Sequence, residues 1–151
     1  MKFLINGRTY EREIPADRML LELLREMGFF GAKRGCDTEN CGLCTVWVDG
    51  RPVLSCSYPA MRAAGREITT IEGVQEEAEA FGRAMADRGA EQCGYCSPGF
   101  VMTVLAMKRE LDHPTREEVK AYLAGNLCRC SGYTSQTEAV MAYLEEEASW
   151  Q

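Results

Sequence analysis

Residues 35–44 read GCDTENCGLC and place three cysteines, Cys36, Cys41 and Cys44, in one short loop. A fourth cysteine, Cys56, follows after eleven further residues. This C-x4-C-x2-C spacing with one later cysteine is a ligand pattern for a [2Fe–2S] cluster, which needs four thiolates. Because Cys56 must be delivered by a later part of the chain, the cluster and the fold have to form together.

The same four cysteines have two alternative uses. A structural zinc ion also accepts four thiolates, but zinc sites usually combine two short cysteine pairs, whereas here one loop supplies three ligands. Disulfides suit the crowded loop less well. The N-terminus also lacks the long apolar stretch of a secretory signal, so the sequence predicts a cytoplasmic protein.

A second group of four cysteines lies thirty-six residues after the first. It consists of Cys93 and Cys96, spaced C-x2-C, and of Cys128 and Cys130, spaced C-x-C. Each pair precedes a segment with helical character, so helix N-termini would point unpaired N–H groups at the sulfur atoms. The sequence therefore predicts a second metal centre, for which zinc is again the alternative.

Composition excludes several classes of protein. The chain has 151 residues, 46% of them hydrophobic, and a formal net charge of −6. Its Lys and Arg residues are scattered, so no basic face offers itself to nucleic acid. The longest apolar run, residues 100–107, is far shorter than the ~20 residues of a bilayer span.

The N-terminal half reads as a small domain of strands and one helix, residues 1–73. Residues 2–14 predict a hairpin that turns at Asn6-Gly7, and residues 45–56 predict another that turns at Asp49-Gly50. Between them, apolar residues at helical spacing predict a helix over 20–27 that Asp17 caps. A short helix over 58–64 and a strand over 68–71 complete this half.

The C-terminal half, residues 74–151, reads as four helices with short connections. The pattern predicts helices over 74–88, from Ser97-Pro98 onward, from Thr115 to Gly125, and over 132–147. Ser97 is the expected N-cap of the second helix, and residues 115–118 form a capping box. The sequence thus predicts an α+β fold with a C-terminal four-helix bundle.

Two further stretches make a family resemblance specific. Residues 91–99, EQCGYCSPG, and residues 125–133, GNLCRCSGY, resemble two signatures of the iron–sulfur subunit of molybdenum hydroxylases. This group includes xanthine dehydrogenase, aldehyde oxidoreductase and carbon monoxide dehydrogenase. Residues 35–44 resemble the third signature, and residues 1–73 resemble the β-grasp fold of plant-type ferredoxins. The resemblance covers nearly the whole chain.

The resemblance implies two [2Fe–2S] clusters and two kinds of partner. Cys36, Cys41, Cys44 and Cys56 would bind the cluster nearer FAD, and Cys93, Cys96, Cys128 and Cys130 the cluster nearer molybdenum. Gln92 and Cys130 would lie against a molybdopterin that a large partner subunit holds. A further subunit would hold FAD, and the assembly would be a dimer of heterotrimers. No catalytic residue is expected in this chain.

Three positions depart from the family pattern. Glu39 stands where many relatives have Gly, and Leu43 where Ala is usual. Gln136 replaces an Ile on the inward face of the last helix. Because a buried amide needs hydrogen-bond partners, we predict that Gln136 bonds to backbone or to another subunit.

The sequence leads to one principal function and two alternatives. The first is an electron-transfer subunit that relays single electrons between a molybdopterin centre and FAD. The alternatives are a zinc-stabilised binding adaptor and a free-standing ferredoxin-like carrier. His113, the single histidine, follows no nucleophilic pattern and is expected to be solvated in its loop.

Overall fold

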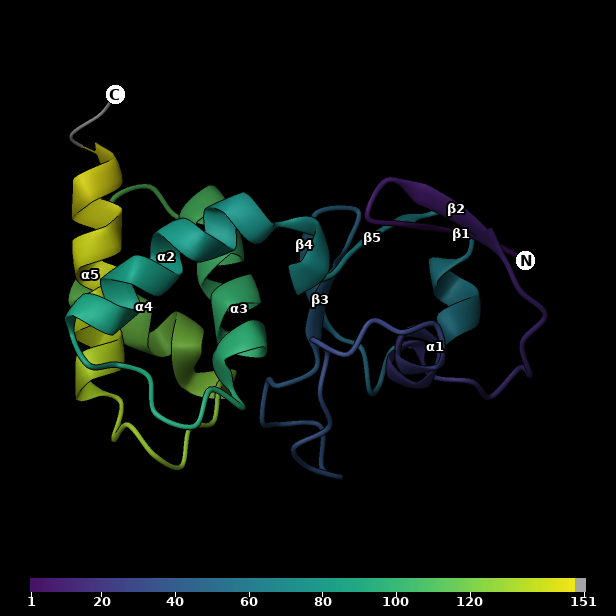
Figure 1. The fold of residues 1–151 in the computed structure, drawn as a ribbon, viewed down its shortest axis with the longest axis horizontal. Helices are drawn as coiled ribbons and strands as arrows, with labels where there is room; N and C mark the ends of the chain where they lie inside the picture. Colours follow the sequence, from purple (N-terminus) through teal and green to yellow (C-terminus); the bar gives the residue numbers. More distant parts are fainter. Residues whose placement is uncertain (149–151) are drawn as a thin grey trace.

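The N-terminal half forms one five-stranded mixed sheet in the computed structural model, which describes residues 1–148 without the side chains of 146–148. The strand order is β2-β1-β5-β3-β4. Strands β1 and β5 are parallel, and the other neighbours are antiparallel. The strands are β1 (Lys2–Ile5), β2 (Arg8–Glu11), β3 (Thr45–Val48), β4 (Arg51–Leu54) and β5 (Glu67–Thr69). Figure 1 shows the sheet beside a separate group of helices.

Both predicted hairpins are confirmed. Asn6 and Gly7 have φ angles of 49° and 75°, and Asp49 and Gly50 have 50° and 76°. Two consecutive positive φ angles fit the tight turns whose twist matches antiparallel strands, and Asn-Gly and Asp-Gly adopt them readily. The second hairpin carries the chain back from β3 toward the cysteine loop, and Cys56 follows directly after β4.

Helix α1 (Leu20–Glu26) covers the sheet, but the predicted cap by Asp17 is wrong. The N-cap is Met19, whose own N–H donates to Glu22 Oε2 at 3.0 Å. Met19 is extended because it pairs with Pro59, so the helix starts later than expected. Free N–H groups of the first turn instead reach the chain around Cys56: Leu20 donates to Tyr58 C=O and Leu21 to Ser55 C=O.

The segment after β4 contains two short 3-10 turns, η1 (Ala60–Ala63) and η2 (Ile71–Gly73). The helical half follows, with α2 (Gln75–Asp87), α3 (Ser97–Glu110), α4 (Arg116–Tyr122), the turn η3 (Leu123–Gly125) and α5 (Thr134–Ala148). The capping box at Thr115 is confirmed, because its hydroxyl accepts from Glu118 N–H and its N–H donates to Glu118 Oε2. Ser97 is not the cap of α3: Cys96 holds that position, and the Ser97 hydroxyl donates to Glu91.

Two groups of buried residues form the interior. One lies between α1 and the sheet and includes Phe3, Leu24 and Ile68, all 0% exposed. The other lies among the four helices and includes Phe81 and Val140, both 0% exposed. Trp47 of β3 belongs to the helical group, and its indole N–H donates to Met102 C=O in α3 at 3.0 Å. The sheet and the helices are therefore joined by a shared interior.

None of the helices in the described part of the chain combines the length and the apolar character that crossing a membrane would require.

Candidate iron–sulfur sites

The first quartet lies where the loop after α1 meets the end of the second hairpin. Cys41 and Cys44 are 3% and 2% exposed, while Cys36 and Cys56 are half-buried. The buried Ser55, next to Cys56, donates from both its N–H and its hydroxyl to Cys44 C=O, at 3.3 and 2.6 Å. This link holds the late cysteine against the loop that carries the other three.

The thiols of this quartet form two neighbouring pairs with contrasting surroundings. Backbone N–H groups, chiefly that of Asn40, and the thiol of Cys41 lower the pKa of Cys36 to about 6. Burial, together with the neighbouring thiol of Cys44, raises the pKa of Cys56 to about 12. The loop therefore favours the thiolate of Cys36, the form that binds metal, whereas Cys56 would have to lose its proton to become a ligand.

The second quartet is assembled from two loops at one end of the helical half. Cys93 and Cys96 precede α3, and Cys128 and Cys130 lie between η3 and α5. The Sγ atoms of Cys93 and Cys130 are 3.6 Å apart, and both residues are exposed. Cys96 and Cys128 form the other pair and are half-buried.

Ser131 provides local donors to this second site. Its N–H and its hydroxyl both donate to Cys128 Sγ, at 3.3 and 3.2 Å. Burial alone would raise the pKa of Cys128, but these hydrogen bonds outweigh it and lower the pKa to about 7. The N-terminus of the last helix was expected to supply N–H donors to these sulfur atoms. Instead α5 begins at Thr134, and the donors come from the loop before it.

The arrangement in pairs bears on which metal fits. Each iron of a [2Fe–2S] cluster takes two thiolates, and each quartet presents two pairs of neighbouring thiols. A single zinc ion needs four ligands around one point. The donor sets therefore fit two two-iron clusters.

The two sites are joined by a backbone hydrogen bond and by close backbone contacts at glycines. Leu127 N–H, next to Cys128, donates to Cys41 C=O at 2.8 Å. A Cβ on Gly99 would collide with Gly42 C=O and come within 2.8 Å of Leu43 Cα, and one on Gly42 would collide with Gly125 C=O. The missing side chains thus permit the first cysteine loop to touch α3 and η3. Sequence reasoning missed this contact, although the glycines inside both motifs are the signal for it.

The structure also places the other residues that the sequence singled out. Gln92 is exposed, so its expected contact with molybdopterin stays a prediction. Glu39 has a φ of 59°, the left-handed region that glycine adopts easily, which fits the Gly that the resemblance implies at this position. Arg34 pairs with Glu22 at 2.6 Å and with Asp37 at 3.7 Å. His113 is exposed and beside Asp112, as expected for a solvated loop residue.

Comparison with known proteins gives matches along the chain. A family described as "2Fe-2S iron-sulfur cluster binding domain" matches residues 3–70, and one described as "[2Fe-2S] binding domain" matches residues 70–141. The xanthine dehydrogenase iron-sulfur-binding subunit of Escherichia coli O157:H7 is 42% identical over 91% of this chain and 89% of its own length.

Two further relatives agree with these matches. The nicotinate dehydrogenase small FeS subunit of Eubacterium barkeri is 38% identical over 96% of this chain and 94% of its own length. In the crystal structure of quinoline 2-oxidoreductase from Pseudomonas putida 86, one chain superposes with a TM-score of 0.89 and 34% identity. That match covers 99% of this chain and 95% of the other.

Proposed function

Because the chain belongs to the family of [2Fe–2S] iron–sulfur subunits of molybdenum hydroxylases, we propose that it relays single electrons between a molybdopterin centre and FAD held by partner subunits. A [2Fe–2S] cluster in each quartet supplies one-electron oxidation and reduction. The chain's own residues hold the two sites at a fixed separation and bury Cys41 and Cys44 of the first. The observation that carries the proposal is the hydrogen bond between Leu127 N–H and Cys41 C=O, which joins the two quartets directly.

The direction of the relay follows from exposure and from the family. Cys93 and Cys130 are exposed, so the second quartet can face a partner's cofactor. We assign Cys93, Cys96, Cys128 and Cys130 to the cluster nearer molybdenum, with Gln92 and Cys130 against the molybdopterin. Cys36, Cys41, Cys44 and Cys56 are assigned to the cluster nearer FAD.

The finer organisation is also part of the proposal. Residues 1–73 would act as a β-grasp ferredoxin-like domain and residues 74–151 as a four-helix bundle, each with one cluster. The two groups of buried residues support this division. The assembly would be a cytoplasmic dimer of heterotrimers with a large molybdopterin-binding subunit and a FAD-binding subunit.

Metal analysis of anaerobically purified protein tests the proposal. We expect roughly four iron and four sulfide per chain, because two clusters carry two of each. The protein should be red-brown, lose that colour with dithionite, and show two distinct EPR signals when reduced. Bound zinc in colourless protein would instead support an adaptor, and iron-loaded protein that purifies without larger subunits would support a free-standing carrier.

A further inference from the structure

Gln136 is a buried amide without a partner. It lies in α5, only 3% of its surface is exposed, and its amide forms no hydrogen bond with any residue that the structure describes. Among those residues, no side-chain nitrogen or oxygen is both sealed from solvent and unbonded. The Gln136 amide must therefore reach the open cavity that this residue lines. An amide in such a place is set to bond a group that enters from outside.

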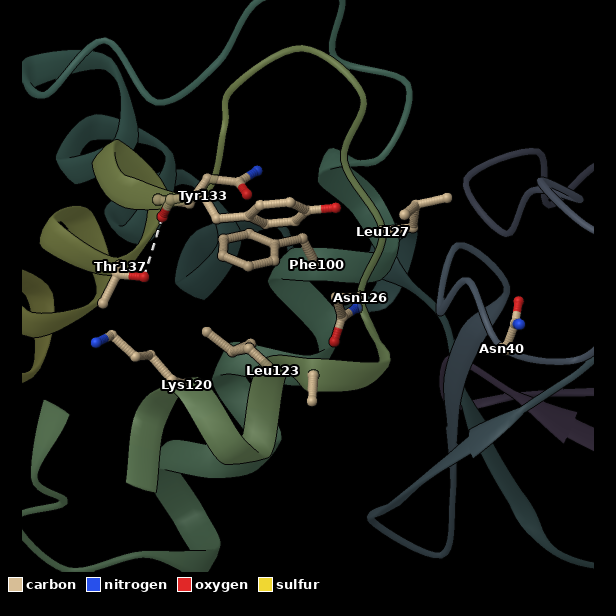
Figure 2. A pocket seen from close by; sticks show the side chains of 10 residues that line it. Asn40, Phe100, Lys120, Leu123, Asn126, Leu127, Tyr133 and Thr137 are labelled. Atoms are coloured by element: carbon tan, nitrogen blue, oxygen red, sulfur yellow. Dashed lines mark hydrogen bonds between the residues drawn. The ribbon is translucent and has the colours of Figure 1, made fainter. Parts of the chain in front are cut away.

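The cavity has a volume of about 590 Å³, which is ample for a large side chain and its backbone. Figure 2 shows the rings of Tyr133 and Phe100 on one side and the side chains of Leu123 and Lys120 on the other. Thr137 also lines it, but its hydroxyl already donates to Tyr133 C=O at 3.0 Å. Among the buried lining residues, the free hydrogen-bonding capacity thus lies at Gln136, while Asn40, Asn126 and Tyr133 line the cavity with more exposed polar groups.

The charges around the cavity favour a neutral occupant. Lys120 is the cation among the lining residues, and its Nζ is 2.9 Å from Glu117 Oε1. Arg116 on the same helix is paired with Glu138. A phosphate or carboxylate would therefore find no unpaired cation here. An amide side chain both donates and accepts, as a peptide group does.

We propose that this cavity receives a segment of the large molybdopterin-binding subunit. An apolar side chain of that segment would fill the space between the aromatic rings and Leu123, and a neighbouring peptide group would bond the Gln136 amide. This inference rests on the proposed function, which supplies the partner. Well-packed apolar anchors with a satisfied polar group are typical of the energetic centre of an interface.

The position of the cavity identifies the large subunit as the occupant. Leu127 and Tyr133, which line it, are 54% and 43% exposed although both are large and mainly apolar. They also bracket Cys128 and Cys130, the loop assigned to the molybdopterin contact. This part of the cavity therefore lies on the face that the proposed function places against the large subunit, although Asn40, next to Cys41 of the first quartet, also lines the cavity. Exposed apolar residues such as Leu127 and Tyr133 are typical of an interaction site.

Gln136→Leu separates an interface role from an internal one. In the purified complex, we expect the large subunit to dissociate about tenfold more readily on dilution, measured by native mass spectrometry, because its peptide group loses its partner. In the isolated, iron-loaded chain, the melting temperature should stay equal or rise, since no internal bond is lost. An unchanged complex, or a melting temperature that falls with complex stability, would overturn the proposal.

Ala124→Trp and Gln75→Leu complete the test. Ala124 lines the cavity and is exposed, so the indole should obstruct entry, weaken the complex at least tenfold and leave the melting temperature of the chain unchanged. Gln75 is an exposed residue of α2 outside the cavity lining, so its replacement should leave the dissociation of the complex unchanged. Its melting temperature is not part of the comparison, because Gln75 Nε2 donates to Ile71 C=O at 2.9 Å. Either variant behaving otherwise would contradict the assignment of the cavity.

A photoreactive benzoylphenylalanine at position 124 identifies the occupant in the intact complex. Adducts to the large subunit would support the proposal, whereas adducts to the flavin subunit or to a second copy of this chain would overturn it. Molybdenum analysis of the same complex distinguishes a failure of the cavity assignment from a failure of the proposed function. A complex that contains molybdenum but forms no such adduct refutes only the cavity assignment, and one without molybdenum refutes the proposed function as well.

Discussion

The first cysteine quartet takes three ligands from nine consecutive residues, whereas the second takes two pairs that are thirty-one residues apart. The first depends on one loop and one hairpin, so its geometry is largely local. The second depends on the packing of α3, α4 and α5, which brings Cys93 within 3.6 Å of Cys130. A compact motif and a distributed one thus support the same chemistry with different dependence on tertiary structure.

The cysteines of the two quartets also differ in their exposure to solvent. Cys41 and Cys44 of the first quartet are almost fully buried, and Cys44 belongs to the interior of the sheet half. Cys93 and Cys130 of the second are exposed. The first site thus has two buried and two half-buried ligands, whereas the second has two half-buried and two exposed ones, on a face that a partner can cover.

Substituting one cysteine ligand should give the largest effect, namely the loss of one cluster while the other is kept. We expect Cys130→Ser to lose about half of the iron and one EPR signal, because one cluster of two irons loses a ligand. The other signal should persist. Iron content and EPR of the reduced protein measure both. Equal loss of the two signals would show that the sites are not independent.

Cys44→Ser is the matched comparison. We expect it to remove the other EPR signal and, in addition, to lower the melting temperature more than Cys130→Ser does, because Cys44 is buried in the sheet half. Equal melting temperatures for the two variants would show that the burial of Cys44 does not add to the stability of the chain.

Disturbing the contact between the first cysteine loop and α3 should give an intermediate effect. In Gly99→Ala, the added methyl group meets Gly42 C=O and Leu43 backbone, which cannot move aside as a flexible side chain can. We expect a loss of roughly 1–3 kcal/mol in the free energy of unfolding, as overpacking typically causes. Denaturant unfolding of the iron-loaded chain measures it.

Gly82→Ala is the control for that substitution. Gly82 lies inside α2, where an added Cβ meets nothing within 4 Å. Alanine is the better helix former, so stability should stay equal or rise by up to about 1 kcal/mol. If both variants destabilise the chain alike, the close approach of Gly99 in α3 to Gly42 is not the cause of the lost stability.

The capping box should give the smallest effect and test the helical half alone. Thr115→Ala removes the hydroxyl that accepts from Glu118 N–H, and we expect a loss of about 1 kcal/mol. Iron content should not change. Thr134→Ala, an exposed threonine whose hydroxyl bonds nothing among the described residues, should be neutral in the same unfolding measurement.

Local signals in the sequence predicted the fold well. Asn6-Gly7 and Asp49-Gly50 produced the hairpins, and Thr115 with Glu118 produced the capping box, because each depends on neighbours within a few residues. The caps assigned to Asp17 and Ser97 were wrong. In the first case the pairing of Met19 with Pro59, forty residues away, sets the start of the helix, and a local rule cannot see such a contact.

The candidate sites show the same limit. Cysteine spacing identified both quartets, but the bond from Leu127 to Cys41 and the approach of Gly99 to Gly42 appear only when the halves are packed. Among the residues that the structure describes, the Gln136 amide has no backbone partner, so that part of the prediction was wrong, while the bond to another subunit stays a prediction. The sequence shows an amide on a buried face but not the opening beside it.

Trp47 has a consequence for dissecting the chain. Its ring belongs to a strand of the sheet, yet it packs among the helices, with the Arg109 guanidinium 3.8 Å from the ring centroid. A fragment cut at residue 73 would leave the helices with a void the size of an indole, at a cost of about 3–5 kcal/mol. Severed pieces would therefore melt well below the intact polypeptide, and neither should be expressed without the other.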